Sequence, residues 1–206
     1  MEKRWGLHPA LKFSEIHFST SQFTYSQVDE ISRRIIPSNL GLSYVPVRST
    51  GNGNCLFNSA SLALCQNETL ADEFRLWTCF ELANNIEFYR KPSVLVNTSV
   101  TYHARDGLGY GFEKAFNNEI MRTAKNWSYS GTLQIMALAS ELGVPIETIY
   151  PDQNDRLLPV YQNVFYARQW SNPADSTVVR ILWANTSGWP DRSKEFVVNH
   201  IVPLFE

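Results

Sequence analysis

Cys55 stands at a position where a thiol could act as a nucleophile. It follows the turn-forming run Gly51-Asn52-Gly53-Asn54 and precedes an apolar stretch that begins with Leu56. At the first turn of a helix, unpaired backbone N–H groups and the positive end of the helix dipole favour the thiolate over the thiol. The stretch therefore predicts a nucleophilic cysteine, with a small buried hydrophobe at a helix start as the alternative.

A cysteine nucleophile needs a base, and His200 is the strongest candidate. In the run FVVNHIVPLF, alternation places His200 on the same strand face as Phe196, Val198 and Val202, so an imidazole interrupts an apolar face. The alternative is a core histidine with satisfied hydrogen bonds. We expect no catalytic role for the three other histidines, which are His8, His17 and His103.

The turn before Cys55 could also supply an oxyanion hole. Small residues allow a substrate backbone to approach closely, and N–H groups in such a turn can point at a developing oxyanion. The two other cysteines, Cys65 and Cys79, lie within apolar faces of predicted helices. A structural role is expected for both.

Composition bounds the class of protein. The chain has 206 residues, of which 44% are hydrophobic, enough for one domain with a sizeable core. Its net charge of −2 gives no reason to expect nucleic acid or a membrane surface as a partner. Three cysteines without a CxxC pair argue against a disulfide scaffold or a cysteine-rich zinc site. With no secretory leader or long apolar run visible, we expect an intracellular protein, cytoplasmic or nuclear.

Periodicity predicts helices before strands. Helices are expected at 26–36, 55–65, 69–90, 113–125 and 132–142. Asn54 is the expected N-cap of the second helix, and Thr69 and Asp72 resemble a capping box for the third. The buried face of this third helix is expected to carry Leu70, Phe74, Trp77, Phe80 and Ala83.

Beyond Gly143 the pattern changes to β-rich runs at 144–150, 158–167, 177–184 and 196–205. The polar segment 185–195 is expected to be a loop between the last two strands. The chain is therefore predicted to be an α/β or α+β domain, with helices flanking a mostly C-terminal sheet.

Three ordered motifs resemble those of the OTU (ovarian tumour) cysteine proteases, which remove ubiquitin from proteins. They are Asn52-Gly53-Asn54-Cys55-Leu56-Phe57, the segment from Trp127 through Gly131 to Ala139, and Asn199-His200. The resemblance implies a papain-like cysteine protease fold over residues 42–206. Residues 1–41 would then be an N-terminal extension packed on the domain.

The run from Leu138 to Arg168, followed by TVVRILWAN, looks particularly like the OTU subgroup that contains vertnin and transposon-associated domains. Members of that subgroup can lack the catalytic cysteine. This chain keeps Cys55 and His200, which favours retained chemistry.

The chain departs from the family pattern at two positions. Asn52 stands where the family usually has Asp, and Val202 stands where many members carry an acidic or amide residue that orients the histidine. A valine cannot accept that hydrogen bond. Asn52 is the first candidate for the missing acceptor and Asn185 the second, and a Cys–His dyad without a third member is the remaining alternative.

The resemblance implies a deubiquitinase that hydrolyses the isopeptide bond after the C-terminal glycine of ubiquitin, with ubiquitin or polyubiquitin as partner. Cys55 would be the nucleophile, His200 the base, and the N–H groups of Asn52, Gly53, Asn54 and Cys55 the oxyanion hole. No metal or organic cofactor is expected. The aromatic walls of the cleft are expected to include Trp127, Tyr129 and Trp189.

Two alternatives follow from the same residues. The first is an inactive OTU scaffold that binds ubiquitin or another protein, which the departures at Asn52 and Val202 favour. The second is a protease for a different ubiquitin-like modifier.

Overall fold

The computed structural model describes residues 27–95, 98, 110–152, 155–156, 158–169 and 178–206. His8, His17 and His103 lie outside these residues, so the expectation about them stays a prediction. The division into an extension over 1–41 and a domain over 42–206 also stays a prediction.

In the described part of the chain, five strands form one mixed sheet in the order β1-β5-β4-β2-β3. Strands β2 and β4 are parallel, and the other neighbouring pairs are antiparallel. The last strand in the chain, β5, therefore lies inside the sheet between β1 and β4. The bounds are Val45–Pro46 for β1, Ile146–Ile149 for β2, Asn163–Phe165 for β3, Val179–Ala184 for β4 and His200–Phe205 for β5.

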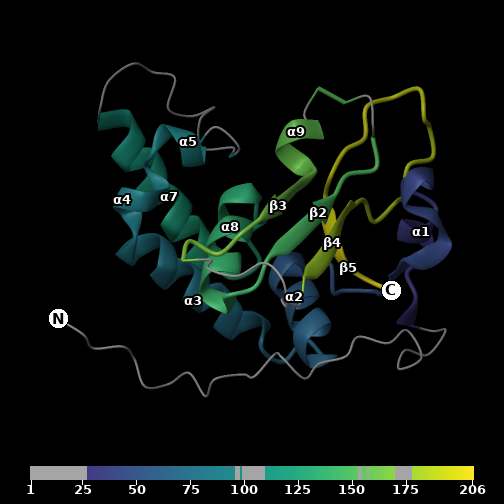
Figure 1. Cartoon of the computed structure of the whole chain (residues 1–206), viewed down its shortest axis with the longest axis horizontal. Helices are drawn as coiled ribbons and strands as arrows, with labels where there is room; N and C mark the ends of the chain where they lie inside the picture. The colour runs from purple at the N-terminus through teal and green to yellow at the C-terminus, as the bar shows by residue number, and fades with distance from the viewer. Residues whose placement is uncertain (1–26, 96–97, 99–109, 153–154, 157, 170–177) are drawn as a thin grey trace.

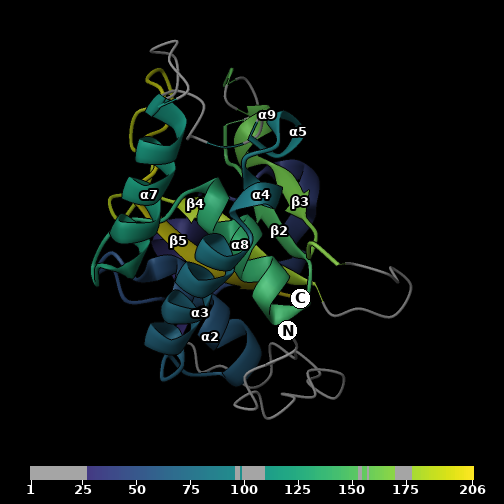
Figure 2. The same ribbon diagram turned by 90° about the vertical axis from the view of Figure 1, so that its left-hand side faces the viewer.

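Helices α2, α3, α7 and α8 form a layer on one side of the sheet, while α1 lies on the other side (Figure 1). Seen from the helical side, this layer covers the strands (Figure 2). The helix bounds are Glu30–Arg33 for α1, Cys55–Cys65 for α2, Ala71–Asn84 for α3, Ile86–Tyr89 for α4, Pro92–Leu95 for α5, Tyr110–Ala124 for α7, Thr132–Leu142 for α8 and Leu158–Tyr161 for α9, with a 3-10 helix η4 at Ser38–Ser43. None of the described helices is long and apolar enough to cross a membrane.

The predicted helices at 55–65 and 132–142 are confirmed as α2 and α8. Every residue of α2 from Cys55 to Leu64 is buried, because the helix lies between the sheet and the other helices. Helix α8 ends at Gly143, whose φ of 67° closes the last turn in the left-handed conformation.

The prediction for 69–90 is wrong in detail. The segment forms two helices, α3 and α4, which meet at Asn85. The capping box is absent, because the Thr69 N–H and hydroxyl bind Asn67 while Asp72 accepts from the side-chain amide of Asn54. The side chain of Asp72 is therefore committed to the turn before α2.

The buried face of α3 also differs from the predicted one. Phe80 is 49% exposed, whereas the charged residues Arg75 and Glu81 are each only 4% exposed. Both buried charges are hydrogen-bonded, which allows the helix to turn a polar stripe inward.

All four predicted strands are shorter in the structure, most of all those at 158–167 and 196–205. The segment 158–167 holds the short helix α9 followed by β3, and the turn between them is held because the Tyr161 carbonyl accepts from Thr148 Oγ1 and Trp183 Nε1. The run 196–205 enters the sheet only at His200, opposite Ala184. His200 is therefore the first residue of β5.

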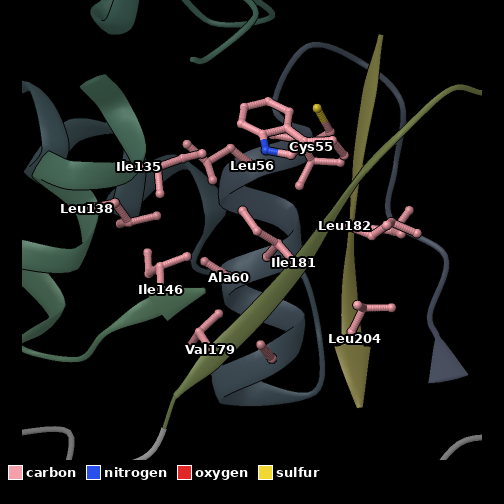
Figure 3. Packing of buried hydrophobic residues seen from close by; sticks show 14 of the residues in the cluster. Cys55, Leu56, Ala60, Ile135, Leu138, Ile146, Val179, Ile181, Leu182 and Leu204 are labelled. Carbon is pink, nitrogen blue, oxygen red and sulfur yellow. The ribbon is translucent and has the colours of Figure 1, made fainter. Parts of the chain in front are cut away.

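Cys55 lies at the end of the main apolar cluster, which α2, α8 and the sheet share (Figure 3). Its sulfur is directed away from the labelled aliphatic side chains of that cluster. The packing therefore fixes the helix while leaving the thiol at the boundary of the core.

Candidate active site

Cys55 and His200 line one cleft with a volume of about 800 Å³. The cleft lies where the N-terminal ends of α2 and α8 meet strands β4 and β5. The structure thus brings together the two residues that the sequence predicted as nucleophile and base. The other lining residues are Arg122, Tyr129, Ser130, Gly131, Thr132, Arg156, Val160, Tyr161, Trp183, Val198, Asn199 and Ile201.

Cys55 is buried, with 3% of its surface exposed. Burial raises the pKa of the thiol above its ordinary value, and the backbone N–H groups of Ile201, Leu56 and Cys55 itself, together with the charge of Arg75, oppose that shift. The resting side chain is therefore a thiol, and the N–H groups around it stabilise the thiolate once a proton leaves.

The two nitrogens of the His200 ring have different surroundings. Nε2 lies 3.2 Å from Ser49 Oγ, while Nδ1 is buried without a hydrogen-bond partner in the described residues. Burial lowers the pKa of His200, and the charges of Asp29 and Glu68 and a backbone interaction with Ser49 oppose this shift. The imidazole is therefore neutral near pH 7, with one unpaired nitrogen.

Ser49 is fixed from its other side. Its hydroxyl donates to the carbonyl of Ile201 at 2.6 Å, and the hydroxyl of Ser59 donates to the same carbonyl at 3.0 Å. Ser59 lies one helical turn after Cys55 on α2. The segment before the turn, the nucleophile's helix and strand β5 are thus joined at one backbone oxygen.

Asn52 does not orient the imidazole, which corrects the sequence-based expectation. Its Oδ1 accepts from the Asn54 N–H at 3.1 Å and from Asn58 Nδ2 at 3.3 Å, so the side chain folds back over its own turn. The second candidate, Asn185, donates to the Val197 carbonyl in the loop before β5. The side chain that is hydrogen-bonded to the His200 ring is that of Ser49, which no sequence pattern singles out.

Val202 is fully buried in β5 opposite Leu182 of β4. It belongs to the apolar core, as its side chain requires. The position that orients the histidine in many OTU members is therefore a packing position here.

The backbone N–H groups of the turn are only partly free. The N–H of Asn54 is taken by Asn52 Oδ1. The N–H groups of Asn52, Gly53 and Cys55 make no backbone hydrogen bond to another of the described residues, and the Cys55 N–H acts only on its own sulfur. Three of the four predicted oxyanion donors thus remain available.

The turn is held in place by Arg75, a buried cation on α3. One guanidinium nitrogen, Nη2, donates to the Gly53 carbonyl at 2.9 Å, to Asn54 Oδ1 at 2.7 Å and to the Ser128 carbonyl at 2.9 Å. The other, Nη1, donates to the carbonyls of Thr123 at 2.8 Å and Lys125 at 3.2 Å. Arg75 therefore ties the turn before α2 to the segment between α7 and α8.

Asn54 occupies the N-cap position of α2 but does not cap it through its side chain. Its Oδ1 accepts from Arg75 and from the Trp127 N–H at 3.2 Å, and its Nδ2 donates to Asp72 at 3.2 Å. The prediction of Asn54 as the N-cap residue is confirmed, but no side-chain capping hydrogen bond forms because these contacts use the amide.

Of the three predicted aromatic walls, only Tyr129 lines the cleft. The Trp127 side chain is 70% exposed, and Trp189 packs against Phe196 and beneath the Arg192 guanidinium instead. Trp183, whose Nε1 donates to the Tyr161 carbonyl, is the lining tryptophan. The sequence did not identify Trp183, because the apolar pattern of β4 does not show which face of the strand lines a cleft.

Two hydroxyls at the start of α8 also lack partners. Ser130 Oγ and Thr132 Oγ1 are buried atoms without a hydrogen bond in the described part of the chain, and both residues line the cleft. Buried polar atoms are nearly always satisfied, so these two hydroxyls are suited to bind a substrate. Among the residues that the structure describes, no cluster of His, Cys, Asp and Glu could hold a metal ion.

The fold is that of an OTU-type α+β domain. The family model described as "Vertnin, OTU domain" matches residues 46–184, and the chain belongs to this family. The resemblance to the vertnin-containing subgroup is thereby confirmed.

Known relatives are similar over part of their length. Vertnin from Danio rerio is 22% identical over 172 residues, which cover 78% of this chain and 25% of that protein. Vertnin from Bos taurus is 26% identical over 170 residues, which cover 77% of this chain and 25% of that protein. The chain thus spans about a quarter of the length of these relatives.

A solved structure of the OTU domain of OTUD1 is similar in fold. Its TM-score is 0.53 at 15% identity, and the match covers 88% of this chain and 97% of that domain. The predicted OTU-type α+β fold is confirmed.

Replacing Gly53 with alanine should destabilise the protein strongly. Gly53 has a φ of 82°, and an added Cβ would lie 2.1 Å from the Trp127 carbonyl oxygen. We expect Gly53→Ala to lower the free energy of unfolding by at least about 3 kcal/mol in chemical denaturation. Gly143→Ala is the matched control, because its φ is 67° but its Cβ would meet nothing within 4 Å, so a loss of about 1 kcal/mol is expected. Equal losses would contradict the close contact.

The substitution Arg75→Met should detach the turn before α2 from the segment between α7 and α8. Five oxygen acceptors would lose their donor, and we expect a loss of about 4 kcal/mol in the free energy of unfolding. The control is Arg90→Met, since Arg90 is exposed and pairs with Glu87 one turn away on the surface, where a loss below about 0.5 kcal/mol is expected. Similar stability of the two variants would show that the guanidinium does not hold the turn.

Proposed function

We propose that the chain is a thiol-dependent hydrolase that cleaves the isopeptide bond after the C-terminal glycine of ubiquitin. One observation carries the proposal: the cleft that contains the Cys55 thiol also contains His200, with Nε2 hydrogen-bonded and Nδ1 unpaired. A buried, unpaired imidazole nitrogen on a histidine that lines the same cleft as a thiol has the chemistry of a general base.

In the proposed reaction, Nδ1 of His200 takes the thiol proton as the Cys55 sulfur attacks the carbonyl carbon of the terminal glycine. The tetrahedral intermediate collapses when His200 gives that proton to the leaving lysine amine, which leaves a thioester on Cys55. Water then attacks the thioester while His200 takes a proton from it, and the thiol and the free glycine carboxylate are released. Because both groups are neutral at rest, the proton moves during attack and not before it.

The turn before α2 would stabilise the oxyanion. The free N–H groups of Asn52, Gly53 and Cys55 are the proposed donors, since the N–H of Asn54 is already bound. This narrows the predicted oxyanion hole from four residues to three.

The remaining lining residues suit an extended peptide with small side chains. We propose that Ser130 Oγ and Thr132 Oγ1 bind the backbone of the Gly-Gly end, between Tyr129 and the indole of Trp183. No metal or organic cofactor enters this chemistry.

A different ubiquitin-like modifier is a second candidate substrate. The described lining residues include Arg122 and Arg156 but no carboxylate, and Arg122 is paired with Glu119 at 2.6 Å. A tail with acidic side chains beside its terminal glycines would suit this charge.

An inactive scaffold is the competing proposal, and the burial of Cys55 favours it. The thiol is 3% exposed, its pKa is raised, and it makes no hydrogen bond to His200 Nδ1. A scaffold would bind a modifier in the cleft without turning it over.

The test is to incubate the protein with ubiquitin that carries a C-terminal thiol-reactive electrophile and to measure the intact mass. We expect a gain of one ubiquitin in the wild type and none in Cys55→Ala. The matched control is Cys65→Ala, which removes a half-buried thiol at the other end of α2 and should label fully.

The outcomes separate the three proposals. Labelling that survives in Cys55→Ala would contradict a nucleophile at Cys55. Labelling by another modifier in place of ubiquitin would favour the second substrate class. Ubiquitin binding without labelling would favour the scaffold.

Turnover should depend on pH through the imidazole. Because burial lowers the pKa of His200, the base is deprotonated and active down to a pH below its ordinary value of about 6.5. We expect kcat/KM for a fluorogenic ubiquitin amide to fall only below about pH 6.5. A loss of activity with a midpoint above pH 7 would contradict a buried neutral histidine as the base.

A further inference from the structure

We infer that Ser49 is the positioning residue of His200, and that its hydroxyl holds the imidazole in the Nε2–H tautomer with the Nδ1 lone pair free to serve Cys55. The inference deepens the proposed function and rests on it. Ser49 thereby supplies the hydrogen bond to the histidine that Val202 cannot make.

The direction of the hydrogen bonds fixes the tautomer. A serine hydroxyl has one hydrogen, and Ser49 places it on the Ile201 carbonyl at 2.6 Å. Toward Nε2, 3.2 Å away, the Ser49 oxygen can then only accept. Nε2 must carry the hydrogen, so in the neutral ring Nδ1 is the basic nitrogen.

A second hydroxyl makes this arrangement rigid. Ser59 also donates to the Ile201 carbonyl, at 3.0 Å, and it is fully buried on the helix that begins at Cys55. The Ile201 N–H, on the same residue, acts on the Cys55 sulfur. Ile201 therefore contacts the nucleophile through its N–H and the positioning hydroxyl through its carbonyl, and it directly follows His200 in β5.

Strand pairing determines where Ser49 lies. Val45 and Pro46 pair with Phe205 and Leu204, and the Val47 N–H continues the ladder to the Pro203 carbonyl at 3.1 Å. Continued in the same antiparallel register, Ser49 comes level with Ile201. There its hydroxyl donates to the Ile201 carbonyl and lies within hydrogen-bond distance of His200 Nε2, while its backbone also acts on the His200 ring.

The charged groups near His200 cannot replace the hydroxyl. Asp29 caps α1 through the N–H groups of Ile31 and Ser32, and Glu68 is bound to the N–H and hydroxyl of Thr50. Both carboxylates act on the imidazole through charge alone. Ser49 is the residue in the described part of the chain whose side chain is hydrogen-bonded to the ring.

The direct test is the side-chain ¹⁵N NMR spectrum of His200 at neutral pH, with His200→Gln used to assign the signal. We expect a protonated Nε2 and an unprotonated Nδ1 in the wild type. Ser49→Ala should convert this into a mixture of the two tautomers, and Ser49→Thr, which keeps the hydroxyl, should restore the single form. The matched control is Ser59→Ala, which removes a hydroxyl from the same carbonyl but not from the ring, and should keep the Nε2–H form.

A wild-type Nδ1–H tautomer, or an unchanged tautomer in Ser49→Ala, would overturn the inference. Because this readout needs no substrate, it is independent of whether the protein hydrolyses ubiquitin. With a fluorogenic ubiquitin amide, Ser49→Ala should lower kcat about tenfold with KM unchanged, the size expected for one lost hydrogen bond. A rise in KM with kcat unchanged would instead indicate a structural role and contradict positioning.

Discussion

The buried guanidinium of Arg75 is the interaction on which the geometry of the cleft depends. A cation that leaves water needs hydrogen-bond acceptors, and Nη1 and Nη2 of Arg75 find four backbone carbonyls and the side-chain oxygen of Asn54. Nε of Arg75 is buried without a partner in the described residues. The acceptors of Nη1 and Nη2 come from the turn before Cys55 and from the segment before α8. Because one rigid fork binds both, the thiol and the two free hydroxyls of the cleft keep a fixed relation to each other.

The base is attached independently of the nucleophile's turn. His200 begins β5, so its backbone follows the sheet, while its ring is held by Ser49 from the neighbouring extended segment. The Ile201 carbonyl joins this attachment to α2 through Ser59. The site is thus built by two sets of contacts, one through α3 and one through the sheet, which meet at the first turn of α2.

The sequence predicted those parts of the fold and site that local pattern determines. Helices α2 and α8, the place of Cys55 and the apolar face interrupted by His200 follow from periodicity and turn residues. The buried face of α3 could not be predicted by counting apolar residues, because Arg75 and Glu81 are buried in place of Phe80. The available signal in the sequence was that Arg75 and Glu81 interrupt the apolar pattern of this helix. Ser49 gave no signal, since its role depends on a strand partner more than 150 residues away.

The central claim is that Ser49, His200 and Cys55 act as one unit, and a double-mutant cycle on Cys55 reactivity tests it most directly. The rate of Cys55 alkylation by iodoacetamide at neutral pH would be measured in the wild type, Ser49→Ala, His200→Gln and the double variant. We expect each single variant to react more slowly than the wild type, and the double variant to react at the rate of His200→Gln, because Ser49 acts only through the imidazole. Independent, multiplying effects, or a rate that does not change in His200→Gln, would contradict the account.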